Sequence, residues 1–423
     1  MKPLLLLAAR SSWSRRSTLV WVLVCMVLST SLLLAFERVR SDLRSSFLQA
    51  VSGTDLIVGA RTGAIPLMLY SVFRVGNATN NINYSSVQAL AQHRAVAWVV
   101  PISLGDSHRG FPVLGTTRAY FQHFLYGDQQ ALVIKQGQAF AGTLDGLYEA
   151  VVGAEVAEAL NYKLGQKITL SHGSGGPLAM EHADKPFTVV GILARTGTPV
   201  DRTVHVSLEA IEAIHLDWAG GAPMPGMSIP ADQARKFDLT PKQVTAALVG
   251  LKSRAAVFNV QRHVNSYETE PLMAVLPGVA LDELWSVVGA GEKALLGMSV
   301  MVGVVSLLGL IAVVLAGLNE RRRELAVLRA VGARPGHLLV LLALEGGLVT
   351  LLGVLVGAVL TTLLMAVGAP WLRSHYGVQL RWAEWSGVQM GWVLSIVLAG
   401  LFASLWPALR AYRLSLSDGL SPR

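Results

Sequence analysis

The chain has 423 residues, of which 52% are hydrophobic and only 15% are charged, and its mean hydropathy is +0.48. This composition is too apolar for an ordinary soluble protein, but it leaves too much polar sequence for a protein lying wholly within a membrane. The formal net charge of +8 is concentrated in residues 1–17, 319–337 and 410–423, which hold twelve basic and three acidic residues. Basic residues beside hydrophobic segments mark the cytoplasmic side of a membrane, so the expected partner of this charge is the lipid membrane and not nucleic acid.

The first hydrophobic segment is expected to be an uncleaved transmembrane helix. Residues 1–17 have the pattern of an amphipathic helix on the cytoplasmic membrane surface, and residues 18–36 follow as a span of about 28 Å in helical form. A signal peptide is the alternative, but no small-residue cleavage site follows the apolar run. The single cysteine, Cys25, lies in this segment, which excludes an intrachain disulfide and a cysteine-based metal site.

Residues 37–293 have the sequence pattern of a folded α/β domain outside the membrane, with short strand-like runs separated by turn residues. They are numerous enough to form their own core, and we expect two subdomains. Alternation and turn residues predict strands at 55–58, 96–102, 111–114, 168–171, 187–193, 203–206 and 245–251, and helices at 86–93, 154–161 and 208–215. A helical pattern over 281–293 continues into the next hydrophobic segment, which predicts one stiff helix joining the domain to the membrane.

Three more membrane spans are expected, at residues 294–318, 338–367 and 388–409. A cytoplasmic connection at 319–337 separates the first two of these, a short periplasmic loop at 368–387 separates the last two, and 410–423 form a cytoplasmic tail. The predicted fold is thus an α-helical membrane protein with four transmembrane helices and a large mixed α/β periplasmic domain between the first and second. Both termini are expected in the cytoplasm.

The third span carries a row of small residues and one acid. Gly346, Gly353 and Gly357 recur at helical spacing, which favours close packing of helices, although glycine is also generally common in membrane helices. Glu345 lies about two turns into the span. A carboxylate there indicates either a functional group or an ion pair with an arginine of the cytoplasmic connection, and the sequence does not decide between them.

Catalytic motifs are absent from the sequence. No phosphate-binding GxxxxGK[ST] loop occurs, nor does GxSxG, HExxH or a CxxC pair, so we expect a subunit that is not an enzyme and holds no cofactor of its own. Eight of the ten histidines fall in the outer domain, but none has the i, i+4 or HxH spacing typical of metal ligands. No metal site is assigned. The nearest approach to one is the pair His172 and His182, which flank a glycine-rich loop close to Glu181 and Asp184.

The cytoplasmic connection is the most concentrated signal in the chain. Asn319 suits a helix cap, Gly332 a helix end and Pro335 the start of the next helix. Between Asn319 and Gly332, an apolar side and a charged side predict a short amphipathic helix parallel to the membrane that offers side chains to a cytoplasmic partner. A loop held to anionic lipid by its arginines is the alternative.

The cytoplasmic connection and the span after it resemble the MacB and FtsX-like permeases of ABC transporters. The stretch that carries this resemblance is ERRRELAVLRAVGARPGHLLVLLALEGGLVTLLGVLVGAVL. The resemblance extends from residue 294 to about residue 413. The outer domain is similar to the periplasmic core domain of that family through VPISLGDSHRGFPVLGTT at Val100, VVGAEVAEALNYKLGQKITL at Val151 and FTVVGILARTGTPVDRTVHVSLEAIEAIH at Phe187.

The resemblance implies a homodimer of permeases in the bacterial inner membrane, each copy docked to a separate cytoplasmic ABC ATPase that binds ATP and magnesium. It implies mechanotransmission, in which ATP hydrolysis moves the periplasmic domains and no ordinary tunnel passes the substrate. A coupling element would contact the ATPase through Glu320, Arg321, Arg322, Arg323, Glu324, Leu328, Arg329, Val331, Gly332 and Ala333.

Two other functions stay open. An FtsX-like permease would use the same movement to activate a periplasmic partner such as a cell-wall hydrolase. A metal or haem efflux permease would use the histidines or the small-residue faces of the membrane helices. No ATPase, adaptor-binding or lipoprotein-binding segment is recognisable in the chain, so the resemblance does not supply the substrate.

Overall fold

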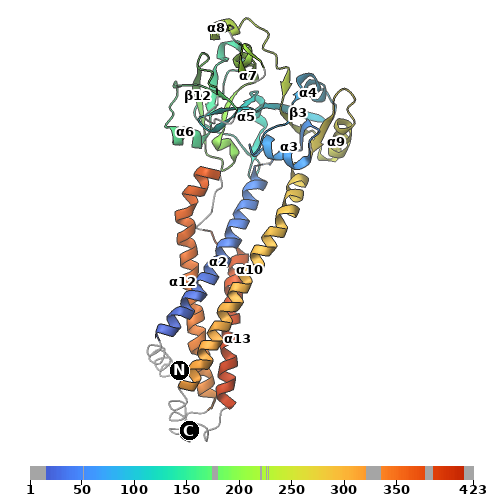
Figure 1. Ribbon diagram of the computed structural model, residues 1–423. Coiled ribbons are helices and arrows are strands. Elements are labelled where there is room, and N and C mark those ends of the chain that lie inside the picture. The colour runs from blue at the N-terminus through green and yellow to red at the C-terminus, as the bar shows by residue number, and fades with distance from the viewer. Residues whose placement is uncertain are drawn as a thin grey trace. The chain divides into compact units, whose positions relative to one another are not determined.

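The computed structural model describes residues 16–50, 52–173, 180–219, 222–224, 226, 228–320, 335–376 and 384–413 (Figure 1). They fall into two compact units. One unit consists of long helices from both ends of the chain, and the other consists of Leu43–Val288 and a short segment at 373–379.

Most of four long apolar helices form the helical unit (Figure 1), while residues 43–49, 277–288 and 373–376 at the ends of three of them belong to the other unit. The four helices are α2 (Arg16–Gln49), α10 (Pro277–Glu320), α12 (Pro335–Tyr376) and α13 (Gly387–Arg413). Their candidate membrane spans are Leu19–Ser45, Pro277–Ala316, Ala343–Leu372 and Gly387–Trp406. The four spans and the α/β insertion between the first and second are therefore confirmed. The predicted amphipathic helix at 1–17 falls almost wholly outside the described residues.

The expected continuous helix before the second span is also present. Helix α10 contains 44 residues without interruption, which corresponds to about 66 Å, roughly twice the thickness of the hydrocarbon core of a bilayer. Helix α12 begins at Pro335, where the fixed backbone angle of proline suits the first turn.

The α/β unit is built on one long mixed sheet with the strand order β10-β12-β9-β13-β5-β3-β17-β1-β18. Neighbours are antiparallel except β12 with β9 and β13 with β5. The strands of this path are β1 (Leu56–Ala60), β3 (Val96–Ser103), β5 (Phe111–Thr116), β9 (Glu149–Val152), β10 (Lys167–Ile168), β12 (Phe187–Leu193), β13 (Val204–Ser207), β17 (Ala246–Leu251) and β18 (Leu272–Val275).

Shorter strands pair beside this path. Strand β4 (Asp106–His108) joins β5 to β11 (Ser171–His172), and β8 (Ile134–Gly137) pairs with β12. Three separate pairs are β2 (Ile82–Asn83) with β16 (Gln243–Val244), β6 (Leu125–Tyr126) with β7 (Gln130–Ala131), and β14 (Trp218–Ala219) with β15 (Ala222–Pro223).

The helices of this unit are short. They are α3 (Ala64–Ser71), α4 (Tyr84–Ala91), α5 (Ala119–His123), α6 (Ala154–Leu160), α7 (Leu208–His215), α8 (Ala231–Ala234) and α9 (Val257–Asn265), with 3-10 turns η1 (Leu144–Gly146), η2 (Pro199–Arg202) and η3 (Arg254–Ala256). Buried side chains around β9, β12 and β13 pack with α6 and α7 at one end of the sheet, and those around β1, β17 and β18 pack with α4 and α9 at the other. The expected division into two subdomains stays a prediction, because one sheet runs through both clusters.

Most predicted strands and helices are present within a few residues of their expected bounds, and β12 and α7 match at both ends. The exception is the strand expected at 168–171, which the structure divides into β10 and β11 with different partners. The two residues between them leave the sheet because the carbonyl of Thr169 accepts a hydrogen bond from the His108 ring and that of Leu170 accepts one from the backbone of His182. Strands β9 and β18 of the main path have no counterpart among the predicted strands.

Candidate functional site

The predicted coupling element lies at the end of the second span. Helix α10 ends at Glu320, and α12 begins at Pro335. The other coupling residues, Arg321, Arg322, Arg323, Glu324, Leu328, Arg329, Val331, Gly332 and Ala333, lie outside the described residues. Their role stays a prediction.

Two of the predicted packing glycines place α12 directly against α2. A β-carbon on Gly353 would lie 2.7 Å from Cβ of Met26, and one on Gly357 would lie 2.9 Å both from Cβ of Thr30 and from the carbonyl oxygen of Val27. Separations this short are closer than carbon atoms in contact allow. The first and third spans therefore approach each other at positions where only glycine fits, as small residues permit in membrane helices.

The third glycine faces the last span. A β-carbon on Gly346 would lie 2.5 Å from Cβ of Ser404 in α13, whose hydroxyl group donates a hydrogen bond to the carbonyl of Ala343. Glu345 lies beside this contact and is 2% exposed, so the membrane carboxylate noted in the sequence is buried within the helical unit. Helix α12 thus contacts α2 and α13 through one row of small residues.

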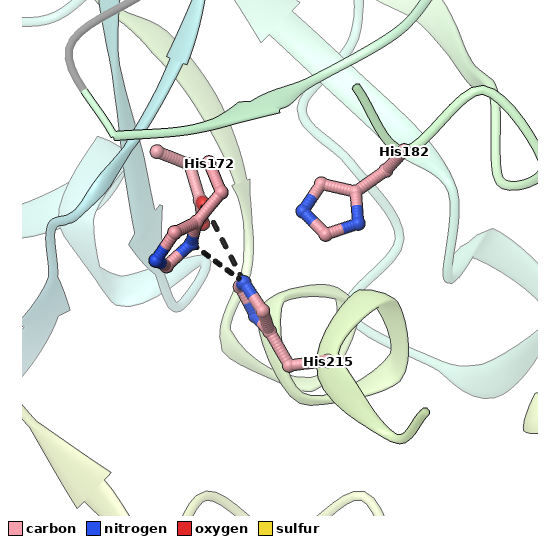
Figure 2. Close-up of side chains that lie close together, drawn as sticks. His172, His182 and His215 are labelled. Carbon is pink, nitrogen blue, oxygen red and sulfur yellow. Dashed lines mark hydrogen bonds and ion pairs between the residues drawn. The ribbon is translucent and has the colours of Figure 1, made fainter. Parts of the chain in front are cut away.

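A cluster of histidines occupies the α/β unit where three separate segments meet (Figure 2). Strands β4 and β11 pair so that Asp106 lies directly opposite His172. His215 comes from the last turn of α7, and His182 follows the loop after β11. One ligand atom from each of these four residues lies within 4.8 Å of the corresponding atoms of the others.

Three of these side chains are in direct contact. Nδ1 of His172 lies 3.2 Å from Oδ1 of Asp106 and 3.2 Å from Nε2 of His215, and Nε2 of His215 lies 3.5 Å from the same carboxylate oxygen (Figure 2). Nδ1 of His215 lies 2.8 Å from the backbone carbonyl of Ile211. A carbonyl only accepts hydrogen bonds, so Nδ1 of His215 carries a proton and Nε2 is the atom that faces the cluster.

Burial and neighbouring charges shift the pKa values of Asp106 and His215 in opposite directions. Burial alone would raise the pKa of Asp106, but hydrogen bonds with His172 and His215 lower it to about 2. Burial would lower the pKa of His215, but the hydrogen bond and charge of Asp106 outweigh it and the pKa is raised. His182 has no such partner, and burial followed by the charge of His215 lowers its pKa to about 4. The carboxylate is therefore ionised and His182 neutral at physiological pH.

The segments that carry the cluster are held in place by a buried ion pair. Nζ of Lys185, which is fully buried, lies 2.9 and 3.1 Å from the two carboxylate oxygens of Asp217. A third oxygen contact, of 2.9 Å, joins Nζ of Lys185 to Oδ2 of Asp184. Because Lys185 follows His182 closely and Asp217 precedes Trp218, this pair fixes the two segments against each other. The ring centroids of Trp218 and His182 accordingly lie 4.2 Å apart, with the two ring planes tilted by 41°.

The sequence identified two of these four residues. His172 and His182 lie together, as their positions around the glycine-rich loop suggested, but the acids named beside them have other contacts. Asp184 pairs with Lys185, and Glu181 forms a backbone bridge with Ser171. Asp106 and His215 were not recognised as partners, because the contact depends on the β4 and β11 pairing and on the direction of α7. No local spacing in the sequence signals either.

These features define a membrane protein in which a four-helix unit with tight small-residue contacts carries a large α/β domain between its first and second spans. The family models agree with this class: the MacB-like periplasmic core domain matches residues 18–267, and the FtsX-like permease C-terminal domain matches residues 296–416. The chain belongs to the MacB/FtsX-like family of ABC transporter permeases. Permeases of this family work with ABC ATPases, form dimers and are generally the non-catalytic component.

Two solved structures with similarity to the chain are a periplasmic region and an extracellular domain of other transporters. The periplasmic region of MacB from Actinobacillus actinomycetemcomitans is 13% identical over 56% of this chain and 97% of that one, with a TM-score of 0.35. The extracellular domain of YknZ, a noncanonic ABC-type transporter from Gram-positive bacteria, is 13% identical over 52% of this chain and 98% of that one, with a TM-score of 0.29. No curated protein matches the chain.

Proposed function

We propose that this chain is the permease subunit of a MacB-like transporter of the mechanotransmission type. Two copies assemble in the bacterial inner membrane with both termini in the cytoplasm and the α/β unit in the periplasm. Each copy docks a separate ABC ATPase, which binds ATP and magnesium. ATP hydrolysis by these ATPase subunits moves the α/β units of the permeases. This movement serves export, extraction or release of a substrate on the periplasmic side.

The observation that carries this proposal is the uninterrupted helix α10. It begins at Pro277, directly after strand β18 of the main sheet, and ends at Glu320, where the predicted coupling element starts. A helix of 44 residues with no internal proline lacks the commonest cause of a sharp kink. We infer that force applied at its cytoplasmic end is passed along this helix toward strand β18.

The packing of the helical unit supports the same mechanism. Helix α12 follows the coupling element and is tied to α2 through Gly353 and Gly357 and to α13 through Gly346. Hydroxyl groups add cross-links, since Thr361 of α12 bonds to the carbonyl of Ser31 in α2 and Ser306 of α10 bonds to that of Cys25. A displacement of α12 is thus passed to its neighbours.

The proposal is tested by replacing one acid and one base of the coupling element together. The variant Glu320→Ala/Arg323→Ala is expected to insert normally but to lower coupled ATPase activity of the reconstituted complex at least about tenfold, equivalent to about 1.4 kcal/mol of lost coupling. Asp418→Ala/Arg423→Ala is the matched control, because it also removes one acid and one base from a predicted cytoplasmic segment.

Two results would contradict the proposal. One is full coupled ATPase activity in the Glu320→Ala/Arg323→Ala variant, which would show that these residues do not couple the permease to the ATPase. The other is periplasmic activity of a reporter enzyme fused after Arg423, which would overturn the orientation of all four spans.

A further inference from the structure

The distances between the ligand atoms of the histidine cluster match those of a tetrahedral metal site. A tetrahedral zinc ion holds nitrogen and oxygen ligands at about 2.0–2.2 Å, which sets the ligand atoms about 3.3–3.5 Å apart. The three distances among Oδ1 of Asp106, Nδ1 of His172 and Nε2 of His215 are 3.2, 3.2 and 3.5 Å. These three atoms therefore already form one face of a coordination tetrahedron.

The positions of the protons on these side chains favour binding of a cation by the three contacting atoms. The backbone carbonyl of Ile211 fixes the proton of His215 on Nδ1, so in the neutral ring Nε2 presents a lone pair. Without an ion, a hydrogen bond from His215 to Oδ1 of Asp106 needs a second proton, on Nε2. A bound cation would take the place of that proton, since metal ligands bind in their deprotonated form. A metal-bound histidine usually donates its other ring N–H to a carbonyl, a carboxylate or water, as Nδ1 of His215 does to the carbonyl of Ile211.

His182 supplies an independent observation. Its ring is fully buried, and among the described residues neither ring nitrogen has a hydrogen-bond partner. Leaving a buried polar group unpaired costs about 1–3 kcal/mol, and buried polar groups in proteins are normally paired. The ring lies near His215 and apart from the marked contacts (Figure 2), and one ligand atom of each of the four residues lies within 4.8 Å of those of the others. A displacement of at most about 1.5 Å would bring the ligand atom of His182 to the fourth corner.

An ion can reach the cluster from solvent. The side chain of His172 is 38% exposed and that of His215 is 25% exposed, whereas Asp106 is 6% exposed. The site thus has a solvent-facing side formed by two imidazoles and an enclosed side formed by Asp106, His182 and the indole ring of Trp218. The ion pair of Lys185 and Asp217 holds the enclosed side in position.

We propose that Asp106, His172, His182 and His215 bind one divalent transition-metal ion, with Zn²⁺ as the ion that fits best. Three imidazoles and one carboxylate are donors that suit zinc, and the distances fit tetrahedral coordination. Ligation would join β4, β11, α7 and the segment after the glycine-rich loop, all within the α/β unit. The site is distinct from the predicted ATPase-coupling element and does not depend on it.

The alternative is a hydrogen-bonded cluster with no metal. A proton on Nε2 of His215 would satisfy Asp106 in the absence of an ion, and the cluster would then serve only to hold the segments together. This arrangement would leave His182 unpaired, and it would show no affinity for zinc above that of scattered surface histidines.

Metal titration of the full chain distinguishes the two. The protein is purified in detergent with an affinity tag that contains no histidines, treated with chelator, and titrated with Zn²⁺ by calorimetry. We expect one equivalent per chain with a Kd of about 1 µM or lower. His172→Gln/His215→Gln is expected to weaken binding at least about 100-fold, since loss of outer-shell partners alone weakens metal sites 10- to 100-fold.

The matched control is His93→Gln/His263→Gln, which removes two neighbouring histidines whose rings are 5.0 Å apart elsewhere on the α/β unit. It is expected to bind zinc like the unaltered chain. Absence of saturable binding in the unaltered chain, or equal binding in both double variants, would overturn the proposal.

A second readout does not depend on folding of the variants. Co²⁺ added to the unaltered chain is expected to give the intense visible absorption bands of tetrahedral coordination, which Zn²⁺ then displaces. Weak bands typical of octahedral Co²⁺, or no bands, would contradict the site. Should the His172→Gln/His215→Gln protein aggregate, this spectrum decides the question.

Discussion

The two units of this protein use the same apolar residues in opposite ways. In the helical unit large side chains lie outside, as Leu351 at 42% and Phe402 at 68% exposure illustrate, and glycines lie at the contacts between helices. In the α/β unit Ile57 and Phe187 are fully buried. Lipid removes the hydrophobic driving force between helices, so the first unit depends on close packing, whereas the second depends on burial of apolar surface from water.

This difference predicts where each unit is sensitive to substitution. The α/β unit has a buried ion pair and buried histidines that water would otherwise solvate, so it is sensitive to changes of charge and to pH. The helical unit has contacts that leave no room for a side chain, so it is sensitive to added volume. The substitutions below test this contrast from the largest expected effect to the smallest.

The largest effect is expected for Lys185→Met. The substitution leaves the carboxylate of Asp217 buried without its cation, which lowers the free energy of unfolding by about 3–5 kcal/mol. Urea denaturation of the full chain in detergent, followed by tryptophan fluorescence, measures the change. Lys236→Met is the control, because Lys236 is exposed and its loss should change stability by less than about 0.5 kcal/mol. Equal effects of the two substitutions would show that the buried pair does not stabilise the unit.

The second effect is a loss of stability in acid that depends on His205. Burial, with a smaller contribution from the charge of Arg74, lowers the pKa of His205 to about 3 in the folded chain, against about 6.5 when unfolded. The unfolded state therefore binds more protons below pH 6.5, and stability falls as the pH decreases from 6.5 toward 3, by about 1.4 kcal/mol per pH unit.

The measurement is the unfolding free energy at pH 6.5 and pH 5.0 in the unaltered chain and in His205→Gln. The unaltered chain should lose about 2 kcal/mol more than the variant over this interval. Other titrating groups, including those of the histidine cluster, are present in both proteins and cancel in the comparison. Parallel pH profiles would mean that His205 takes no part in the acid sensitivity.

The smallest effect is expected in the helical unit, for Gly357→Leu. The new side chain would collide with the backbone of α2 near Val27, and overpacking of this kind costs about 1–3 kcal/mol. A lower midpoint of thermal unfolding in detergent is the readout. Gly309→Leu is the matched control in α10, since no described atom lies within 4 Å of a β-carbon at that position. If Gly309→Leu lowers the midpoint as much as Gly357→Leu, close packing between α12 and α2 does not explain the loss of stability.

The same contrast explains what the sequence could predict. Hydropathy locates the four spans because each span is a single continuous segment, and the residue pattern locates α7. The structure adds a cap to α7, since the Ser207 side chain accepts a hydrogen bond from the backbone N–H of Ala210. The alternation in β12 is likewise local. Each of these features can be recognised within a window of a few residues.

The contacts that these local features make with distant parts of the chain cannot be recognised within a short window of sequence. Glycine spacing in the third span indicates a packing face, but only the structure shows that Gly353 and Gly357 meet α2 and that Gly346 meets α13. Asp106 and His215 are 109 residues apart, and they meet because β4 pairs with β11 and α7 ends beside that pair. Contacts of this kind follow from the order of strands in the sheet, which a single sequence does not specify.

The central claim is that ATP binding moves the α/β units of two assembled permeases. The most direct measurement is pulsed electron spin resonance between single spin labels at position 258, an exposed site on α9, in a complex whose native Cys25 has been replaced by serine. We expect the label-to-label distance distribution to shift between the nucleotide-free complex and a complex trapped with ATP, and the shift to disappear in Glu320→Ala/Arg323→Ala. Identical distributions with and without ATP in a complex that hydrolyses ATP would contradict the account.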